Sequence, residues 1–223
     1  MALPVRWIVL VVLGCGLLGW WLSNPAPALP PPPADTTTSV NSVHAAASAC
    51  PLPPLVERGA APLQSDVPSS MPPLKTEGAS LQPLAGFSIE ARVLGREDYF
   101  IGREAEFSPT DLALGWGRMT EDAVLAQLAI SQGGRWYRYS WKNEPPIPVG
   151  EIVRSSANMH MVPANQDIAA ALRDVDAGDR VRIDGWLVQV NTPDGWRWRS
   201  SLTREDSGGG ACEVVYVCSV QEL

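Results

Sequence analysis

The sequence has few of the residues that metal sites and nucleic-acid sites need. Among 223 residues there are only 2 histidines and 4 cysteines, too few for a zinc finger or a multi-histidine metal enzyme. We therefore predict no metal site and no cofactor. Charged residues make up 18% of the chain and the net charge is −7. Because binding to nucleic acid by counterion release needs clustered lysines and arginines, we also predict no nucleic-acid partner.

Charge is missing altogether from one long apolar run near the N-terminus. Trp7–Leu22 reads WIVLVVLGCGLLGWWL, which spans roughly 24 Å as a helix and reaches the thickness of a bilayer core if it extends over residues 3–23. Arg6 precedes the run, and the next lysine or arginine is Arg58. By the positive-inside rule, residues 1–6 lie in the cytosol and the chain after residue 23 lies outside it. We therefore predict a transmembrane anchor over residues 1–23.

Two other interpretations of this segment stay open. Ala26-Pro27-Ala28 has the small-x-small form of a signal-peptide cleavage site. Leu13-Gly14-Cys15 could instead be a lipid-attachment site, although few apolar residues would then precede the cysteine.

Most of the prolines lie between residues 24 and 85. The chain has 21 prolines, and this stretch includes the run Pro30–Pro33. Its other residues are mainly Ala, Ser, Thr and Leu without helical or strand periodicity, so it cannot bury enough apolar area to offset the entropy lost on ordering. We predict a disordered, proline-rich linker over residues 24–85, assign no role to Cys50 within it, and expect the globular domain over residues 86–223.

Apolar residues alternate with polar ones through much of this domain, which indicates strands. Gly133-Gly134 predicts a two-residue hairpin turn, and Pro193-Asp194-Gly195 predicts a second turn. A helix beginning at Thr120 and a second over 165–175 complete the pattern. The fold class is therefore predicted as β-rich α+β, an elaborated small β-barrel that is OB-like with two short helices; an SH3-like or other β-rich fold is the alternative. The strands are expected over residues 87–94, 97–107, 128–132, 135–141, 156–162, 179–190, 196–203 and 211–221.

Four sequence stretches carry a resemblance. They are Arg96-Glu97-Asp98-Tyr99, residues 112–119 (LALGWGRM), residues 155–163 (SSANMHMVP) and residues 196–213 (WRWRSSLTREDSGGGACE). Over roughly residues 87–218 the chain resembles a family of uncharacterised bacterial membrane-anchored proteins. The resemblance implies no known activity or catalytic residue. Together with the anchor it predicts a single-pass protein of the inner (cytoplasmic) membrane, with its C-terminal domain outside the cytosol.

Aromatic and arginine residues alternate in two stretches that could bind a ligand. On a strand, Trp196 and Trp198 share one face while Arg197 and Arg199 share the other. Rings interleaved with arginines are typical of surfaces that bind sugars or single-stranded nucleic acid by stacking, and the acidic balance of the chain makes nucleic acid the least favoured of these ligands. Alternatively, the rings fill the core and the arginines pair with acids. The predicted binding residues are Arg197, Arg199, Trp196, Trp198, Tyr137, Tyr139 and Arg204.

His160 is the only histidine of the predicted domain 86–223. A strand over 156–162 places it on one face with Asn158 and Ser156. Met159 and Met161 would then face the core. We predict no catalytic residue, with His160 and Ser156 as the alternative. The sequence contains no G-x-S-x-G motif, so no serine is marked as a nucleophile.

Cys212 and Cys218 are too far apart on one strand to pair with each other. Cys50 is then the only other exported cysteine. At most one disulfide can therefore form, and one thiol is left over. Glu213 is an unfavourable neighbour for a reactive thiolate, so we expect Cys212 to be buried and inert.

These observations predict a non-enzymatic binding or assembly module of the bacterial cell envelope. Its partners would be the membrane, through the N-terminal helix, and an envelope protein or a glycan. A small hydrolase that uses His160 with a nearby serine or carboxylate is the alternative function.

The anchor can be tested by cell fractionation and N-terminal sequencing. We expect the mature chain in the membrane fraction with residues 1–23 intact, because Trp7–Leu22 is uncharged and follows Arg6. A product outside the membrane that begins at Leu29 would contradict this prediction.

Overall fold

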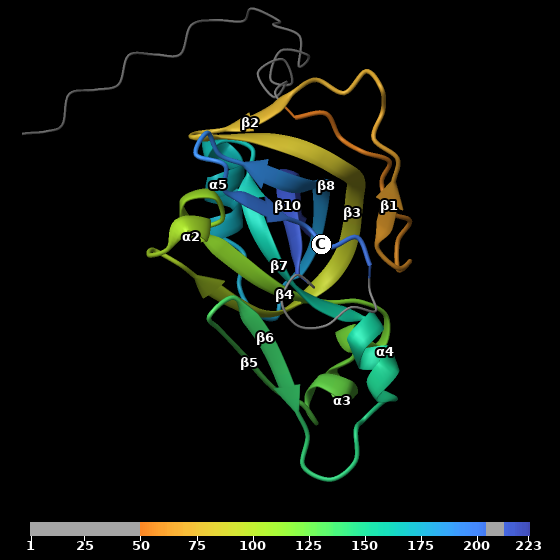
Figure 1. Cartoon of the computed structure of the whole chain (residues 1–223). Helices are drawn as coiled ribbons and strands as arrows, with labels where there is room; N and C mark the ends of the chain where they lie inside the picture. Colours follow the sequence, from red (N-terminus) through yellow and green to blue (C-terminus); the bar gives the residue numbers. More distant parts are fainter. Residues whose placement is uncertain (1–49, 204–211) are drawn as a thin grey trace, which may run out of the picture. The chain divides into compact units, whose positions relative to one another are not determined.

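The computed structural model describes residues 50–203 and 212–223, and these form a β-rich fold with a few short helices (Figure 1). The predicted anchor lies outside the described residues, within which no helix is long and apolar enough to cross a membrane. In chain order the elements are β1 (Leu63–Ser65), β2 (Leu74–Thr76), β3 (Ala79–Asp98), α2 (Arg103–Phe107), β4 (Thr110–Gly115), the 3₁₀ turn η1 (Gly117–Thr120), α3 (Asp122–Leu125), β5 (Ala129–Gly133), β6 (Trp136–Ser140), α4 (Val149–Arg154), β7 (Ser156–Pro163), α5 (Gln166–Arg173), β8 (Arg180–Asn191), β9 (Arg197–Arg199) and β10 (Glu213–Glu222).

Eight strands belong to one sheet, in the order β1-β3-β4-β7-β10-β8-β9, with β2 also paired to β3. β3 pairs with β8 as well as with β4, so the pairing from β3 through β4, β7, β10 and β8 returns to β3. β7 and β10 run parallel, whereas the other pairs are antiparallel. The long strand β3 bends around the others, and its register shifts twice along its length (Figure 1).

One glycine lets β8 and β10 approach closely. A Cβ built on Gly185 would lie 2.0 Å from the backbone oxygen of Tyr216, a separation that no side chain tolerates. The ladder between the two strands shifts register beside this position, between Val217 and Ser219. The glycine therefore accommodates an irregularity that helps the strands to curve.

Alternate residues of the strands form the main core. Met159 and Met161 of β7 are fully buried, as the alternation predicted, and they pack with Leu112 and Leu114 of β4. Leu172 of α5 covers this core. Burying each such side chain contributes about 1.5–3 kcal/mol relative to exposure. The predicted helix over 165–175 is confirmed, and Asn165 caps it by accepting a hydrogen bond from the Ile168 amide at 2.9 Å.

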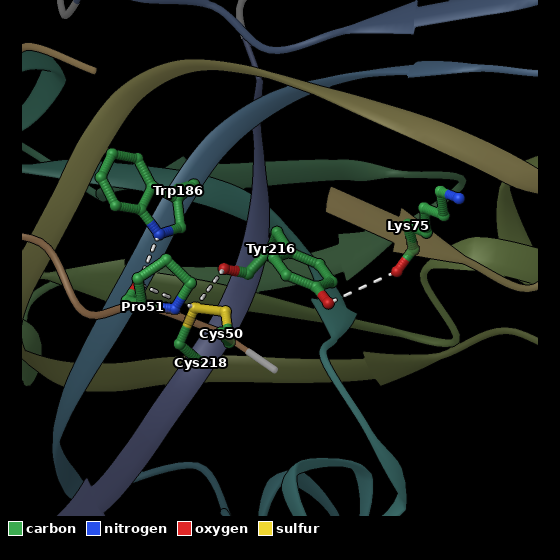
Figure 2. Close-up of a disulfide and its surroundings, with 6 residues drawn as sticks. All are labelled: Cys50, Pro51, Lys75, Trp186, Tyr216 and Cys218. Carbon is green, nitrogen blue, oxygen red and sulfur yellow. Dashed lines mark hydrogen bonds between the residues drawn. A yellow bond between two sulfur atoms is a disulfide. The ribbon is translucent and has the colours of Figure 1, made fainter. Parts of the chain in front are cut away.

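A second cluster lies between the sheet and residues 50–78, here called the strap. β1 and β2 of the strap pair with β3, and Val56 and Leu74 are buried. Cys50 forms a disulfide with Cys218 of β10, their Cα atoms 5.4 Å apart. Figure 2 shows that Trp186 donates its indole hydrogen to the Pro51 oxygen beside this bridge, at 2.7 Å.

The strap corrects the predicted domain boundary. Residues 50–85 lie against the sheet, so the prediction of disorder over 24–85 is wrong for this part, and the fold begins well before residue 86. Residues 24–49 lie outside the described residues. The strap is ordered despite its composition because backbone pairing to β3 and a covalent link to β10 offset the ordering entropy. Neither is visible in local composition.

Other elements also differ from expectation. The predicted strand over 97–107 is instead the end of β3 followed by α2. β4 was missed because all six of its residues are buried, which removes the alternation that identifies a half-exposed strand. α4 was also missed, and four short α-helices, rather than two, occur in the described ranges. The N-cap of α3 is Glu121, not Thr120. The predicted strand over 196–203 shortens to β9.

The disulfide gives a direct stability test. Replacing Cys50 by serine should lower the free energy of unfolding by about 2–4 kcal/mol, because the bridge closes a loop between residues 168 positions apart. Denaturant unfolding of the purified full-length chain, followed by tryptophan fluorescence, measures the loss. Cys212→Ser is the control, since Cys212 is not part of this bridge. A peptide map under non-reducing conditions that lacks the Cys50–Cys218 link would contradict the assignment.

Candidate functional site

A group of buried polar side chains lies on the outer face of β4 and β7. Asp111 of β4 lies opposite His160 of β7, and Ala113 lies opposite Asn158. Because side chains alternate along a strand, Asp111, Asn158 and His160 share the face that points away from the main core. All three are buried, and Asp111 has no exposed surface.

The Asp111 carboxylate binds three neighbours. Oδ1 accepts a hydrogen bond from Arg135 Nη1 at 2.6 Å and lies 2.9 Å from His160 Nδ1. Oδ2 accepts a hydrogen bond from Asn158 Nδ2 at 3.1 Å. A buried carboxylate is stable only when it is paired and fully hydrogen-bonded, and here it is. A hydrogen bond from the His160 ring to this carboxylate oxygen requires the hydrogen to be on Nδ1. We call Asp111, Arg135, Asn158 and His160 the Asp111 cluster.

Arg135 reaches Asp111 from the turn of the β5–β6 hairpin. The predicted hairpin is confirmed, but its two central residues are Gly134 and Arg135, one position later than Gly133-Gly134. Both have positive φ, 60° and 69°, as a type I′ turn requires. Arg135 is the one non-glycine residue with positive φ among the described residues. Such a backbone costs on the order of 1–2 kcal/mol, so its contacts must offset strain.

Those contacts hold the turn on several sides. The Arg135 amide donates to the Tyr99 hydroxyl at 2.8 Å, and its guanidinium lies 3.8 Å from the centroid of the Tyr99 ring. Arg135 Nη2 donates to the Ser108 carbonyl at 2.9 Å. Burial raises the pKa of Tyr99, and the hydrogen bond from Arg135 opposes that rise. Gln132 of the same hairpin donates to Asn158 Oδ1 at 2.8 Å. The hairpin is therefore bound over the β4–β7 face.

The two tryptophans of the predicted binding stretch pack against this site instead of facing solvent. The Trp198 ring lies 4.8 Å from the His160 ring and 6.2 Å from Trp196. Trp196 stacks on Phe107 of α2 at 5.9 Å. Both tryptophans are half-buried. Their rings pack on neighbouring side chains at the edge of the second cluster, and part of each ring stays exposed.

The arginines of the same strand point the other way. Arg197 and Arg199 are exposed. Arg199 donates to Gln189 Oε1 at 3.2 Å, and neither arginine has an ion pair within the residues that the structure describes. Arg204 lies outside the described residues. The predicted binding set therefore splits into rings that pack and arginines that face solvent.

Tyr137 and Tyr139 form a separate aromatic row with Trp141. The Tyr137 and Tyr139 centroids are 5.5 Å apart, and Tyr139 stacks on Trp141 at 6.3 Å. Tyr137 is near Ser156, whose Oγ lies 3.4 Å from its hydroxyl. Burial raises the pKa of Tyr137 to about 12. Tyr139 and Trp141 pack on the small core of α3 and α4, so these rings are not grouped with Arg197.

Serines near His160 bond to the backbone. Ser156 Oγ donates to the Ile152 carbonyl at 2.8 Å. Ser200 Oγ donates to the Ser201 carbonyl at 2.8 Å and accepts from the Val214 amide at 3.1 Å. Within the described residues, His160 bonds to Asp111 and to no serine. The described side chains also form no group of metal-ligating residues. Among the described residues, the hydrolase alternative therefore has a histidine bonded to an acid, and no serine is bonded to that histidine.

Cys212 differs from expectation in degree of burial. It is half-buried, not fully buried, and its sulfur lies 3.9 Å from the Arg135 carbonyl oxygen. The cysteine therefore borders the Asp111 cluster.

A cleft of about 440 Å³ lies beside the stacked rings of Phe107 and Trp196. Arg103 of α2 bonds to Asp194 and, at 3.2 Å, to Thr192 Oγ1 across it. The guanidinium also lies 4.9 Å from the Trp196 ring centroid. The Arg103 hydrogen bond, helped by that from Thr192, holds the pKa of Asp194 below its usual range. The lining residues are Glu77, Gly78, Arg103, Glu106, Phe107, Thr192, Pro193 and Asp194.

Sequence reasoning missed Asp111, Arg135 and Arg103. One usable signal existed for Asp111, because it is the single charge in the otherwise uncharged stretch of residues 110–115. A charge in such a stretch needs a partner once buried. Nothing in the sequence identifies that partner as Arg135, since the pairing depends on where the hairpin lies.

The Asp111–Arg135 pair can be tested by a double-mutant cycle. Asp111→Asn should lower the free energy of unfolding by about 3 kcal/mol, because it leaves the largely buried guanidinium without its counterion. Arg135→Gly should cost much less in that background than in the wild type, with a coupling energy of about 1–3 kcal/mol. Arg138→Ala, an exposed arginine of the same hairpin, is the control and should change stability by less than about 0.5 kcal/mol. Additive losses would contradict the pairing.

No protein-family model matches the chain, and no curated protein or solved structure matches it. The resemblance noted from the sequence therefore stays a prediction, and the function has to be inferred from the side chains described above.

Proposed function

We propose that this protein is a membrane-anchored, exported binding or assembly module of the bacterial cell envelope, built on an OB-like barrel, and that it is not an enzyme. The exposed pair Arg197 and Arg199 is the observation that carries this proposal. The ligand of the protein is then an envelope protein or a glycan that presents carboxylate groups.

The strand pairing supports the OB-like part of the proposal. The pairing of β3, β4, β7, β10 and β8 runs in a circuit, with α5 between β7 and β8. An OB fold is a five-stranded Greek-key barrel, which binds ligands on the face of its second and third strands and on two adjacent loops. Here those strands correspond to β4 and β7. The loops correspond to the β3–β4 connection and the β8–β10 connection.

In this chain the usual ligand face is covered by the chain itself. The Asp111 cluster and Trp198 occupy the outside of β4 and β7. A ligand would have to displace a buried ion pair to reach that face, which is costly. We therefore place binding next to it, at the cleft between α2 and residues 192–194 and along the outer side of β9.

The positive charge on β9 indicates which chemical groups the ligand carries. Arg197 and Arg199 lie two residues apart on one side of the strand, and no acid of the described residues neutralises them. A guanidinium binds a carboxylate through two parallel hydrogen bonds. The protein as a whole is acidic, with a net charge of −7. Two exposed arginines on an acidic protein favour a ligand that brings its own carboxylates to this strand.

The Cys50–Cys218 disulfide supports the proposed location. Stable disulfides form mainly in oxidising compartments such as the bacterial periplasm. This agrees with the topology predicted from Arg6 and the apolar run that follows it.

The proposal predicts that Arg197 and Arg199 are needed for partner recovery. After crosslinking the tagged full-length chain in its native host, the R197A/R199A variant should recover its partner at least about tenfold less well than the wild type, because charge-assisted hydrogen bonds are lost. Recovered proteins are quantified by mass spectrometry and recovered glycans by sugar analysis. Near-UV circular dichroism should be unchanged, since both side chains face solvent.

Two variants serve as controls. R138A/R154A removes the same charge from exposed positions elsewhere and should recover the partner normally. His160→Ala tests the hydrolase alternative and should leave recovery intact in a folded protein. If His160→Ala abolishes an activity while R197A/R199A behaves as wild type, the protein is better described as a hydrolase.

A further inference from the structure

The most exposed large apolar side chains in the described residues are two neighbours in the connection between β3 and α2. Phe100 is 90% exposed and Ile101 is 92% exposed. Contiguous apolar surface that faces solvent marks interaction sites, whereas single exposed apolar residues are ordinary. We call Phe100 and Ile101 the apolar ridge.

The ridge is held in place at its base. The Tyr99 amide donates to the Pro109 carbonyl at 2.7 Å, and the Tyr99 hydroxyl accepts the Arg135 amide. On the other side, the Ala105 amide donates to the Gly102 carbonyl at 3.1 Å, where the connection enters α2. Because both ends of the connection are bonded, the structure presents the ridge in a defined position.

A hollow lies directly beside the ridge. It is a cavity of about 200 Å³ between the connection and α5, and Phe100 forms one wall. Its other apolar lining comes from Pro109, Pro163, Ala169 and Leu172. A ridge and a hollow of similar character that adjoin each other are what a twofold-symmetric interface requires, since each copy must offer both halves of the contact.

The charges around the two features are also complementary. Glu104 and Glu106 follow the ridge, while Arg173 borders the hollow. None of the three has an ion pair within the part of the chain that the structure describes. When the ridge of one copy enters the hollow of another, Glu104 and Glu106 approach Arg173 of that copy.

We propose that this protein self-associates as a twofold dimer in which Phe100 and Ile101 of each copy insert into the hollow bordered by Leu172 and Arg173 of the other. A phospholipid surface is a poorer occupant, because the acidic residues next to the ridge are repelled by anionic headgroups. The proposal goes beyond the binding function above and involves neither Arg197 nor Arg199, so the two can fail independently.

Sedimentation of the full-length chain in detergent tests the dimer. F100S/I101S should raise the dissociation constant of the dimer by at least about a hundredfold, because the apolar area of two large side chains is no longer buried. Val149→Ser is the matched control, since Val149 is an exposed apolar residue of α4, 43% exposed, and it should dimerise as wild type. Far-UV circular dichroism confirms that each variant is folded.

Charge exchange tests the partner geometry. Arg173→Glu should weaken the dimer about tenfold by placing like charges together, and E104R/E106R/R173E should restore it. In membranes from cells that carry two tagged copies, Ile101→Cys in one and Ala169→Cys in the other should form an intermolecular disulfide, whereas Val149→Cys with Ala169→Cys should not. A monomer at all concentrations, or a dimer that F100S/I101S leaves unchanged, would overturn the proposal.

Discussion

A single buried carboxylate determines the arrangement on the outer face of β4 and β7. Asp111 has no exposed surface, so it must be matched by a cation and by hydrogen-bond donors from nearby. Arg135 supplies the cation only if the turn between β5 and β6 lies over this face. The left-handed backbone of Arg135, the position of its hairpin and the contact of Trp198 with His160 are therefore linked features. They bury the Asp111 cluster beneath the hairpin and Trp198, which is why we propose the solvent-facing side of β9 for binding instead.

A second constraint comes from the strap, which precedes the other strands of the sheet in the chain. The strap brings Leu74, with Val67 and Met71, to an apolar surface that β8 and β10 would otherwise expose, including Trp186 and Tyr216. Figure 2 shows how directly the two are joined, with a hydrogen bond from Tyr216 to the Lys75 carbonyl and the disulfide beside Trp186. The strap is thus part of the fold and not a spacer to it.

The features that sequence reasoning predicted correctly are local ones. Period-two alternation placed Met159 and Met161 in the core and His160 on the other face, and Pro193-Asp194-Gly195 marked a turn that closes with a 3.0 Å hydrogen bond from the Gly195 amide to the Thr192 carbonyl.

The features that it missed depend on distant partners. β4 lacks alternation because both of its faces are covered. The strap is ordered by β3 and by Cys218, and Arg135 is recognisable only once Asp111 is known to face it. The anchor over residues 1–23 and the OB-like class remain predictions. So does the charge-based choice of ligand.

The disulfide also decides how the folded part would respond to mechanical load. A force that reaches Cys50 from the residues before it passes through a covalent bond to Cys218 in β10, not along the backbone into the strap. Residues 51–217 form a covalently closed loop, so tension cannot peel β1 and β2 away from β3 one hydrogen bond at a time. The load falls on β10, which is paired along both edges, to β7 and to β8. Such a force would therefore enter the fold at β10 and bypass β1 and β2.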